Sequence, residues 1–206
     1  MLFWILFVIA YIPMLLMFPT KVFNRKKMPK SKCIVTSNHY SNADAPVYVI
    51  QFRRKFSMLA KKELFKNKFL TFFFKCIGAI EVDRENVGIG VFKTVLKELG
   101  KNKQVFIFPE GTRNKEGSDQ MLELKTGIIS FASKGEVEIV PMLMHHKPRL
   151  FRKNYIIVGD PLKIVGENPK RLTKEEVQLN VENYTNAMAA LRIELEEKLT
   201  KKKKKK

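Results

Sequence analysis

Cysteine is scarce in this sequence, which has Cys33 and Cys76 as its two thiols in 206 residues. Small domains that are stapled by disulfides carry many more cysteines for their length, so that class of fold is excluded. Both thiols lie in apolar or strand-like segments. We interpret them as buried and reduced, as expected of a cytoplasmic protein.

Acidic residues are also few: 20 Asp and Glu stand against 39 Lys and Arg, which gives a net charge of +19. Residues 201–206 are all lysine, but without them the balance is still 33 to 20. The excess therefore belongs to the whole chain, and it predicts an anionic partner: a nucleic acid, an anionic lipid surface or a phosphorylated substrate. The basic runs lack the interleaved aromatic residues of nucleic-acid binders, so we expect no nucleic acid.

Glycine and proline number 10 and 9, and they form no linker between domains. The length of 206 residues, of which 45% are hydrophobic, suits one domain with a sizeable core. We therefore divide the chain into an N-terminal hydrophobic membrane segment with a basic cluster (1–30), one domain (31–200) and a poly-lysine tail (201–206).

Charge is absent from residues 1–19, MLFWILFVIAYIPMLLMFP, whereas residues 21–30 carry five basic side chains. A signal peptide is not favoured, because a basic start and a small-residue cleavage site are missing. The run is long enough to span a bilayer, and Pro13 also suits a helix that lies at the membrane interface. A buried core helix is the remaining alternative. Either membrane arrangement places the basic cluster and the following domain on the cytoplasmic face of the cell membrane.

Strand-like and helix-like segments alternate after residue 31. Apolar runs predict strands at 33–36, 56–60, 79–82, 105–108, 139–144 and 155–158. Helices are expected at 44–53, 67–77, 87–99, 126–133 and 173–198, the last opened by a capping box of Thr173 and Glu176. Pro141 indicates that its strand lies at an edge or bends irregularly. The pattern predicts an α/β fold in which helices cover a mixed twisted sheet, with an N-terminal membrane-binding helix.

His39 precedes Asp44 by five residues, in the segment SNHYSNAD. On one continuous helix this step is a rotation of roughly 140°, so the two side chains would face apart. The pair works as a base and its orienter if His39 lies on a loop after a strand and Asp44 begins the next helix. The carboxylate then accepts the Nδ1–H, and Nε2 is left to take a proton. Without other motifs, a loop histidine and a helix cap would explain the same residues.

A second motif follows the strand expected at 105–108 and reads FPEGTR. A turn that contains Gly111 exposes backbone N–H groups, and the Arg113 guanidinium matches the geometry of a phosphate. An ion pair between Glu110 and Arg113 that holds the turn together is the structural alternative. Asp83 and Arg84 end the strand expected at 79–82 in a similar way. The adjacent His145 and His146 are interpreted as structural or surface residues.

These blocks, in this order, resemble the glycerolipid acyltransferase family. His39 to Asp44, Gly78 to Arg84, Phe108 to Arg113 and Val140 to Pro141 are similar to its four motifs. The resemblance covers about residues 30–165 and extends to Lys61, to the LKTG segment at 124–127 and to the GDPL segment at 159–162. Leu124 departs from the phenylalanine that is frequent in the family, which puts nothing catalytic in doubt.

The resemblance implies an enzyme that moves an acyl group from a thioester to the free sn-2 hydroxyl of 1-acylglycerol-3-phosphate, giving phosphatidic acid. His39 would be the general base and Asp44 its orienter. The residues implied to hold the acceptor are Lys61, Arg84, Glu110, Gly111, Thr112 and Arg113. The alternatives are a different acceptor, such as glycerol-3-phosphate or another lysophospholipid, and a non-catalytic basic protein that binds membranes.

The expected partners are therefore a lysophospholipid acceptor, an acyl thioester donor and an anionic membrane surface. The donor carrier stays open between coenzyme A and acyl carrier protein. We expect no bound cofactor and no metal, because no cluster of metal ligands is visible in the sequence. No covalent acyl-enzyme is required, since neither cysteine stands beside His39.

Overall fold

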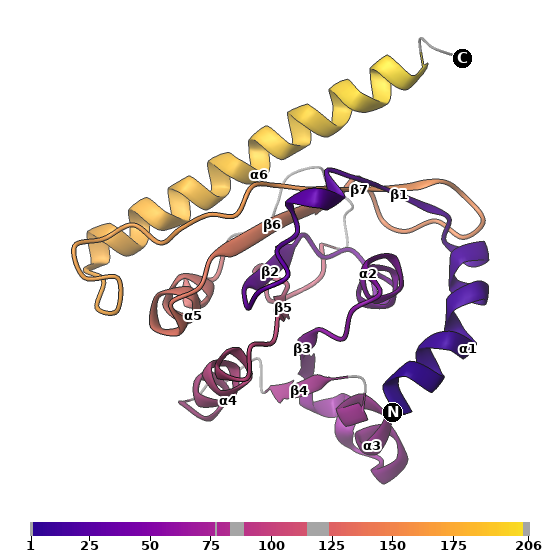
Figure 1. Cartoon of the computed structure of the whole chain (residues 1–206), viewed down its shortest axis with the longest axis horizontal. Coiled ribbons are helices and arrows are strands. Elements are labelled where there is room, and N and C mark those ends of the chain that lie inside the picture. The colour runs from indigo at the N-terminus through magenta and orange to yellow at the C-terminus, as the bar shows by residue number, and fades with distance from the viewer. Residues whose placement is uncertain (1, 77, 83–88, 115–123, 204–206) are drawn as a thin grey trace.

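The computed structural model describes residues 2–76, 78–82, 89–114 and 124–203 (Figure 1). Its centre is a seven-stranded sheet with the order β1-β7-β6-β2-β5-β3-β4. The strands are β1 (Thr20–Phe23), β2 (Ile34–Ser37), β3 (Ser57–Lys61), β4 (Ala79–Val82), β5 (Val105–Ile107), β6 (Ile139–Met144) and β7 (Asn154–Val158). The mixed α/β sheet predicted from the sequence is confirmed.

The five strands β2 to β6 run parallel, and β7 pairs with β6 in the opposite direction. Ile34 of β2 aligns with Val105 of β5 on one side and with Ile139 of β6 on the other. Because these central strands are in register, their carboxyl ends lie at one edge of the sheet, which we call the carboxyl edge. Ligands of open parallel sheets bind at such an edge.

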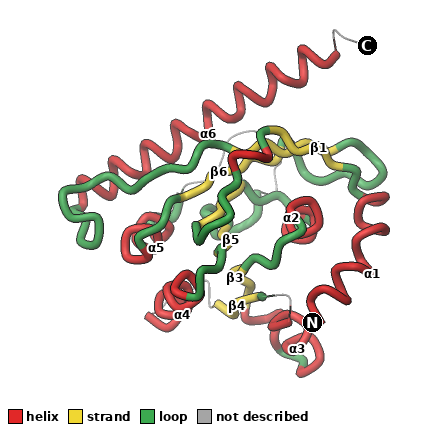
Figure 2. The backbone as a smooth tube through the Cα atoms, viewed as in Figure 1, coloured by secondary structure: helices red, strands yellow, loops and turns green. Residues whose placement is uncertain are grey.

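Helices cover both faces of the sheet, as Figure 2 shows in red beside the yellow strands. The helices are α1 (Leu2–Met17), α2 (Asp44–Phe52), α3 (Lys68–Cys76), α4 (Ile89–Gly100), α5 (Gly127–Gly135) and α6 (Lys174–Lys203). The core side chains alternate along the strands: Ile34 packs with α4, α5 and α6, whereas Val35 packs with α2 on the other face. This period of two follows from the pleat of a strand that is buried on both faces.

The long helix α6 begins with the predicted capping box. The backbone N–H of Thr173 donates to Glu176 Oε2 over 2.8 Å, and the N–H of Glu176 donates to Thr173 Oγ1 over 3.2 Å. Tyr184 and Leu195 of α6 are buried against the sheet. The helix continues five residues past the predicted end, to Lys203.

The helix α1 presents an apolar stripe to the outside. Ile5, Val8, Ile9, Ile12 and Leu16 recur every three or four positions and are each more than half exposed. The opposite side packs on α2, where Phe18 and Met14 join the core. A buried core helix is therefore excluded for this segment. Within the described ranges, no helix is long and apolar enough to cross a membrane.

The strand β1 was not predicted, because residues 20–23 lie inside the basic stretch that follows the apolar run. It forms the edge of the sheet and pairs in parallel with β7, from Thr20 opposite Asn154 to Phe23 opposite Ile157. The phenyl ring of Phe23 stacks on Tyr155 of β7. Part of the basic stretch is thus integrated into the sheet.

Pro141 lies on an interior strand, so the predicted edge position is wrong. Its strand β6 pairs with both β2 and β7. The irregularity is in the segment that pairs with β6. Leu143 lies opposite Ile157 and Ile139 lies opposite Leu162, so this segment has one residue more than β6 over the same stretch. A side chain at Gly159 would lie 2.9 Å from Pro141 Cγ, so this bulge needs a glycine. The bulge accommodates a proline, which cannot donate to the ladder.

Candidate active site

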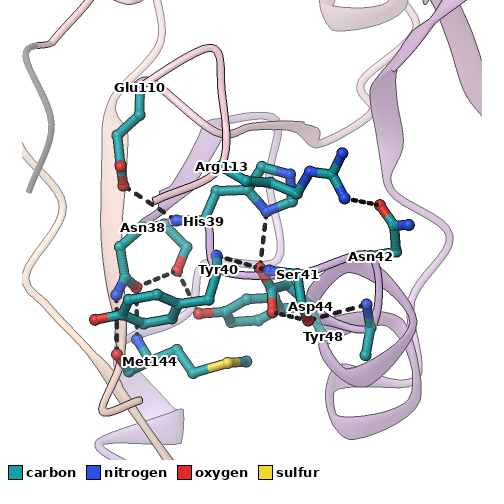
Figure 3. A network of polar contacts seen from close by, with 12 residues as sticks. Asn38, His39, Tyr40, Ser41, Asn42, Asp44, Tyr48, Glu110, Arg113 and Met144 are labelled. Carbon is teal, nitrogen blue, oxygen red and sulfur yellow. Dashed lines mark hydrogen bonds and ion pairs between the residues drawn. The ribbon is translucent and has the colours of Figure 1, made fainter. Parts of the chain in front are cut away.

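His39 and Asp44 occupy the junction that the sequence predicted, at the carboxyl edge of the sheet. His39 lies on the loop that leaves β2, and Asp44 is the first residue of α2. The two side chains face each other, with 2.7 Å between Nδ1 and Asp44 Oδ2 (Figure 3). Among the described residues, nothing forms a hydrogen bond with His39 Nε2. The imidazole can therefore take up a proton at Nε2 while the carboxylate holds the other nitrogen.

The carboxylate of Asp44 is fully buried and held by several donors at once. Its Oδ2 accepts the backbone N–H groups of Tyr40 and Ser41 over 2.6 and 2.7 Å, and its Oδ1 accepts the Ser41 hydroxyl over 3.0 Å. A buried charge needs such partners to be tolerated. The loop therefore fixes the carboxylate before any substrate binds.

The ring and the backbone of His39 are held by the chain that follows β5. The imidazole stacks on the ring of Phe108, with 3.9 Å between ring centroids and 13° between planes. The backbone N–H of His39 donates to Glu110 Oε1 over 3.1 Å, and its carbonyl accepts the N–H of Asn114 over 2.8 Å. Glu110 thus contacts the histidine loop rather than standing at the surface.

Asn38 was not singled out from the sequence, although it ties the histidine loop to β6. Its side-chain amide donates to the carbonyl of Met144 over 2.9 Å and accepts the Met144 N–H over 2.8 Å. The Ser37 hydroxyl lies between Asn38 Oδ1 and the hydroxyl of Tyr48. Burial raises the pKa of Tyr48 well above its usual value, so this phenol stays protonated. The signal for Asn38 in the sequence is that a polar residue follows directly after a buried strand.

A tight turn after β5 brings a glycine and a lysine together. The N–H of Gly111 donates to the Phe108 carbonyl over 3.0 Å, and Gly111 has a φ of 65°, which favours glycine. Lys125 donates its backbone N–H to Pro109, and its ammonium lies 3.1 Å from the position that a Gly111 Cβ would occupy. Lys125 was not among the residues that the sequence predicted for the site. Only the tertiary fold places it over the turn.

The predicted cationic residues differ in how near they stand to His39. The Arg113 side chain lies beside the imidazole and donates to Asn42 Oδ1 over 3.2 Å, so it crosses the mouth of the histidine loop (Figure 3). Thr112 is exposed next to it. Lys61 ends β3 at the same edge and is 3.3 Å from Glu63. Arg84 lies outside the described residues.

A cavity of about 1090 Å³ opens beside the turn. Glu110, Gly111 and Thr112 line one part of it, and the rest is mainly apolar. Its apolar walls come from β3, β4, β5, α4 and α5, with the side chains Leu59, Val82, Ile107, Val91, Phe92, Ile128 and Phe131. The volume slightly exceeds the range of about 300–1,000 Å³ that is usual for ligand pockets. The arrangement suits a ligand with a polar head and a long apolar part.

The remaining candidate groups stand apart from this site. Cys33 is buried at the other end of β2, and burial raises its pKa to about 12, so it is a poor nucleophile. The side chain of Cys76 lies outside the described residues. His145 Nε2 contacts Glu196 of α6 over 2.7 Å, and this contact links the end of β6 to α6, which is a structural role. The part of the chain that the structure describes holds no cluster of metal ligands.

Comparison with known proteins places this geometry in a sequence family. The model of the family described as Acyltransferase matches residues 19–145. The 1-acyl-sn-glycerol-3-phosphate acyltransferase of Bacillus subtilis is 34% identical over 151 residues, which cover 69% of this chain and 73% of that protein. The protein with the same name from Borreliella burgdorferi is 30% identical over 129 residues, which cover 62% of this chain and 51% of the relative. The chain thus spans nearly three quarters of the first relative and about half of the second.

A solved structure shares the fold. The 1-acyl-sn-glycerophosphate (LPA) acyltransferase PlsC from Thermotoga maritima superposes with a TM-score of 0.63 at 22% sequence identity. The match covers 86% of this chain and 71% of that one. At this identity the likeness concerns the fold, which agrees with the mixed sheet described above.

Proposed function

This chain belongs to the acyltransferase family, and on that premise we propose that it acylates the free sn-2 hydroxyl of 1-acylglycerol-3-phosphate. The product is phosphatidic acid, and the acyl donor is a thioester of coenzyme A or of acyl carrier protein. The observation that carries the proposal is the 2.7 Å contact between His39 Nδ1 and a buried Asp44, which leaves Nε2 without a partner among the described residues.

In the proposed reaction, His39 Nε2 removes the proton from the acceptor hydroxyl as its oxygen attacks the thioester carbonyl. The tetrahedral intermediate collapses, the C–S bond breaks, and the proton passes from His39 to the leaving thiolate. Asp44 keeps the imidazole in one tautomer and stabilises the imidazolium that forms. No residue of the enzyme becomes acylated, and the buried Cys33 takes no part.

The acceptor phosphate is proposed to bind at the mouth of the histidine loop. Lys125 lies against the Gly111 turn, Arg113 follows the turn and reaches Asn42, and Lys61 stands at the same edge. An arginine fork and exposed backbone N–H groups suit a phosphate, and each charged hydrogen bond contributes about 1.5–3 kcal/mol. Arg84 stays part of this proposal on the family resemblance alone. Glu110 is proposed to position the backbone of His39 rather than to touch the phosphate.

The apolar part of the cavity is proposed to hold a fatty acyl chain. The exposed stripe on α1 is proposed to rest in the interfacial region of a bilayer, from which the acceptor is taken. The helix carries no charged side chain, so a lipid interface offers its exposed apolar face a more favourable surrounding than water does. The basic cluster would face the anionic headgroups on the cytoplasmic side.

An acceptor panel with the purified protein tests the substrate. We expect phosphatidic acid from 1-acylglycerol-3-phosphate and an acyl thioester, with a lower rate on glycerol-3-phosphate and on lysophospholipids with larger headgroups. Mass spectrometry of the products provides the measurement. A preference for glycerol-3-phosphate, or for a bulky headgroup, would contradict the proposed acceptor and leave the acyl-transfer chemistry standing.

Replacement of the proposed base tests the chemistry. His39→Ala should lower kcat about 10²–10⁴-fold, because that is what general-base catalysis contributes. The circular dichroism spectrum should be unchanged, since the backbone bonds of His39 to Glu110 and Asn114 do not depend on its side chain. Gln178→Ala removes an exposed polar side chain of α6, away from the site, and should keep full activity. Turnover near that of the unmodified protein in His39→Ala would refute the mechanism.

A further inference from the structure

The loop between β6 and β7, residues 145–153, has a composition that the acyl-transfer chemistry does not use. It reads HHKPRLFRK, with Lys147, Arg149, Arg152 and Lys153 and no acidic residue. All four basic side chains are exposed, and within the described part of the chain none of them pairs with a carboxylate. Between them stand Leu150, which is 52% exposed, and Phe151, which is 73% exposed.

Hydrogen bonds from one buried side chain fix the conformation of this loop. The buried side chain of Asn154 accepts the Arg149 N–H over 2.8 Å and donates to the carbonyls of Arg149 and Arg152 over 3.1 and 2.9 Å. Phe151 has a φ of 54°, an unfavourable value for a bulky residue. These bonds hold the apolar pair at the tip although it gains no contact with the core.

The tip of the loop is joined to the exposed helix α1. The N–H of Phe151 donates to the carbonyl of Met17, the last residue of α1, over 2.7 Å. Figure 1 shows the loop, in orange, reaching the end of α1 beside β1. The exposed Leu16 and Met17 thus continue into the apolar pair of the loop as one surface.

The same surface lies at the carboxyl edge of the sheet. The loop starts directly after Met144, whose backbone is paired with the side chain of Asn38, the neighbour of His39. A surface docked through this loop would therefore face the edge at which the proposed reaction takes place. An exposed apolar pair framed by basic residues fits an anionic lipid surface, because the headgroups attract the cations and the interface takes up the apolar side chains.

We propose that the β6–β7 loop is a second membrane-docking element, which inserts Leu150 and Phe151 into an anionic bilayer beside α1. The proposal deepens the proposed function, since it assumes that the acceptor is drawn from a lipid surface. It predicts two contact points, α1 and the loop, and these orient the carboxyl edge toward the bilayer. One contact alone would allow the molecule to tilt.

Co-sedimentation with vesicles tests the apolar tip. Leu150→Ser with Phe151→Ser should weaken binding to vesicles of equal parts phosphatidylcholine and phosphatidylglycerol about tenfold. The matched control is Val165→Ser with Leu179→Ser, which removes two similarly exposed apolar side chains elsewhere and should bind as the unmodified protein does. Equal binding of both double variants would overturn the proposal.

Charge reversal tests the basic frame. Lys147→Glu with Lys153→Glu should weaken binding to the same vesicles at least about tenfold and leave the weak binding to pure phosphatidylcholine unchanged. Lys134→Glu with Lys163→Glu makes the same change of net charge at other exposed positions and should have a much smaller effect. If the two pairs behave alike, net charge rather than this loop attracts the membrane.

A fluorescence measurement keeps the proposal testable if the double variants fold poorly. The sequence has one tryptophan, Trp4, so Phe151→Trp in a Trp4→Phe background reports on the loop alone. Its emission should shift to the blue on addition of anionic vesicles and be quenched by brominated lipids, whereas Leu179→Trp in the same background should not respond. Unchanged emission at position 151 in vesicle-bound protein would overturn the insertion.

Activity on a soluble, short-chain acceptor separates this proposal from the proposed function. The loop variants should keep full activity there and lose it on vesicles. If the enzyme fails to acylate any lysophospholipid, the vesicle measurements still decide the docking. If the variants instead lose binding to an acyl carrier protein and keep vesicle binding, the loop docks a donor protein and the membrane proposal is refuted.

Discussion

The two edges of the parallel strands carry charges of different kinds. At the amino edge, Glu98 of α4 contacts Lys101 and Lys103 over 2.7 and 2.5 Å and accepts the Ser57 hydroxyl over 3.0 Å. At the carboxyl edge, Asp44 is satisfied by its own loop, but Arg113 and Lys125 reach no carboxylate among the described residues. At the first edge both lysines pair with a carboxylate, whereas at the second, within the described part of the chain, Arg113 and Lys125 do not.

This difference separates stability from function. Charges that form ion pairs with each other stabilise the folded chain and are not available to bind a ligand. Cations that have no carboxylate partner repel one another and lower the stability of the folded chain, and a bound anion relieves this repulsion. The carboxyl edge therefore has the character of a binding site before any particular substrate is considered. Variants at the two edges should accordingly affect different measurements.

Among the variants that compare the two edges, the largest effect is expected at Asp44. Asp44→Asn should lower kcat about 10³-fold, because the amide no longer holds the imidazole in one tautomer or stabilises its protonated form. Steady-state assays on the proposed acceptor measure this, and KM should change little. Asp160→Asn, an exposed carboxylate that contacts Lys27, is the control and should be fully active. A kcat within tenfold of normal in Asp44→Asn would mean that the pair is structural.

Arg113 should show the next largest effect. Arg113→Ala should raise the KM for the phosphate-bearing acceptor about 10- to 100-fold, as expected for the loss of charged hydrogen bonds of about 1.5–3 kcal/mol. Its KM for a monoacylglycerol, which lacks the phosphate, should not change. Arg171→Ala, an exposed arginine elsewhere, controls for net charge. Equal changes of KM for the two acceptors would show that Arg113 shapes the site without binding the phosphate.

Glu98 should affect stability alone. Burial would raise its pKa, but hydrogen bonds from Lys101, Lys103 and Ser57 outweigh burial and lower the pKa to about 2. Because the folded pKa is depressed, the stabilisation is present above about pH 4.5 and is lost as the pH falls toward 2. Glu98→Gln should cost about 2 kcal/mol of unfolding free energy at pH 7.

Urea unfolding at pH 7 and pH 3 measures the contribution of Glu98, and the gap between the variant and the unmodified protein should narrow at pH 3. Glu167→Gln, at an exposed position, is the matched control. The kcat on the proposed acceptor should stay normal in both variants. A loss of kcat in Glu98→Gln at full stability would break the division between the two edges.

The arrangement of His39 and Asp44 was predictable because the information is local, whereas the role assigned to the pair came from the other motifs and the family resemblance. The spacing of His39 and Asp44 permits one productive arrangement, a loop followed by a helix start, and the structure has it. Most strands and helices were predictable as well, since apolar runs and the capping box of α6 depend on neighbouring residues. The catalytic role of the pair stays a proposal.

The features that the sequence did not predict depend on partners far along the chain. The strand β1 is a short basic segment that becomes a strand only because β7 offers an unpaired edge. Pro141 is tolerated in an interior strand because Gly159 leaves room for it. Lys125 reaches the site because the Gly111 turn folds beneath it. In each case the contact that decides the outcome joins residues far apart in the sequence, so the pattern of neighbouring residues does not reveal it.

The pairing of β1 with β7 also sets an order of events during synthesis. Thr20 and Asn154 lie more than 130 positions apart, so α1 leaves the ribosome on the order of ten seconds before the strand that positions it, at roughly 5–20 residues per second. During that interval α1 lacks the pairing of β1 with β7 that fixes its carboxyl end, while its apolar stripe is already exposed. The helix that is made first is thus fixed in place late, and a nascent chain could meet a lipid surface before its domain closes.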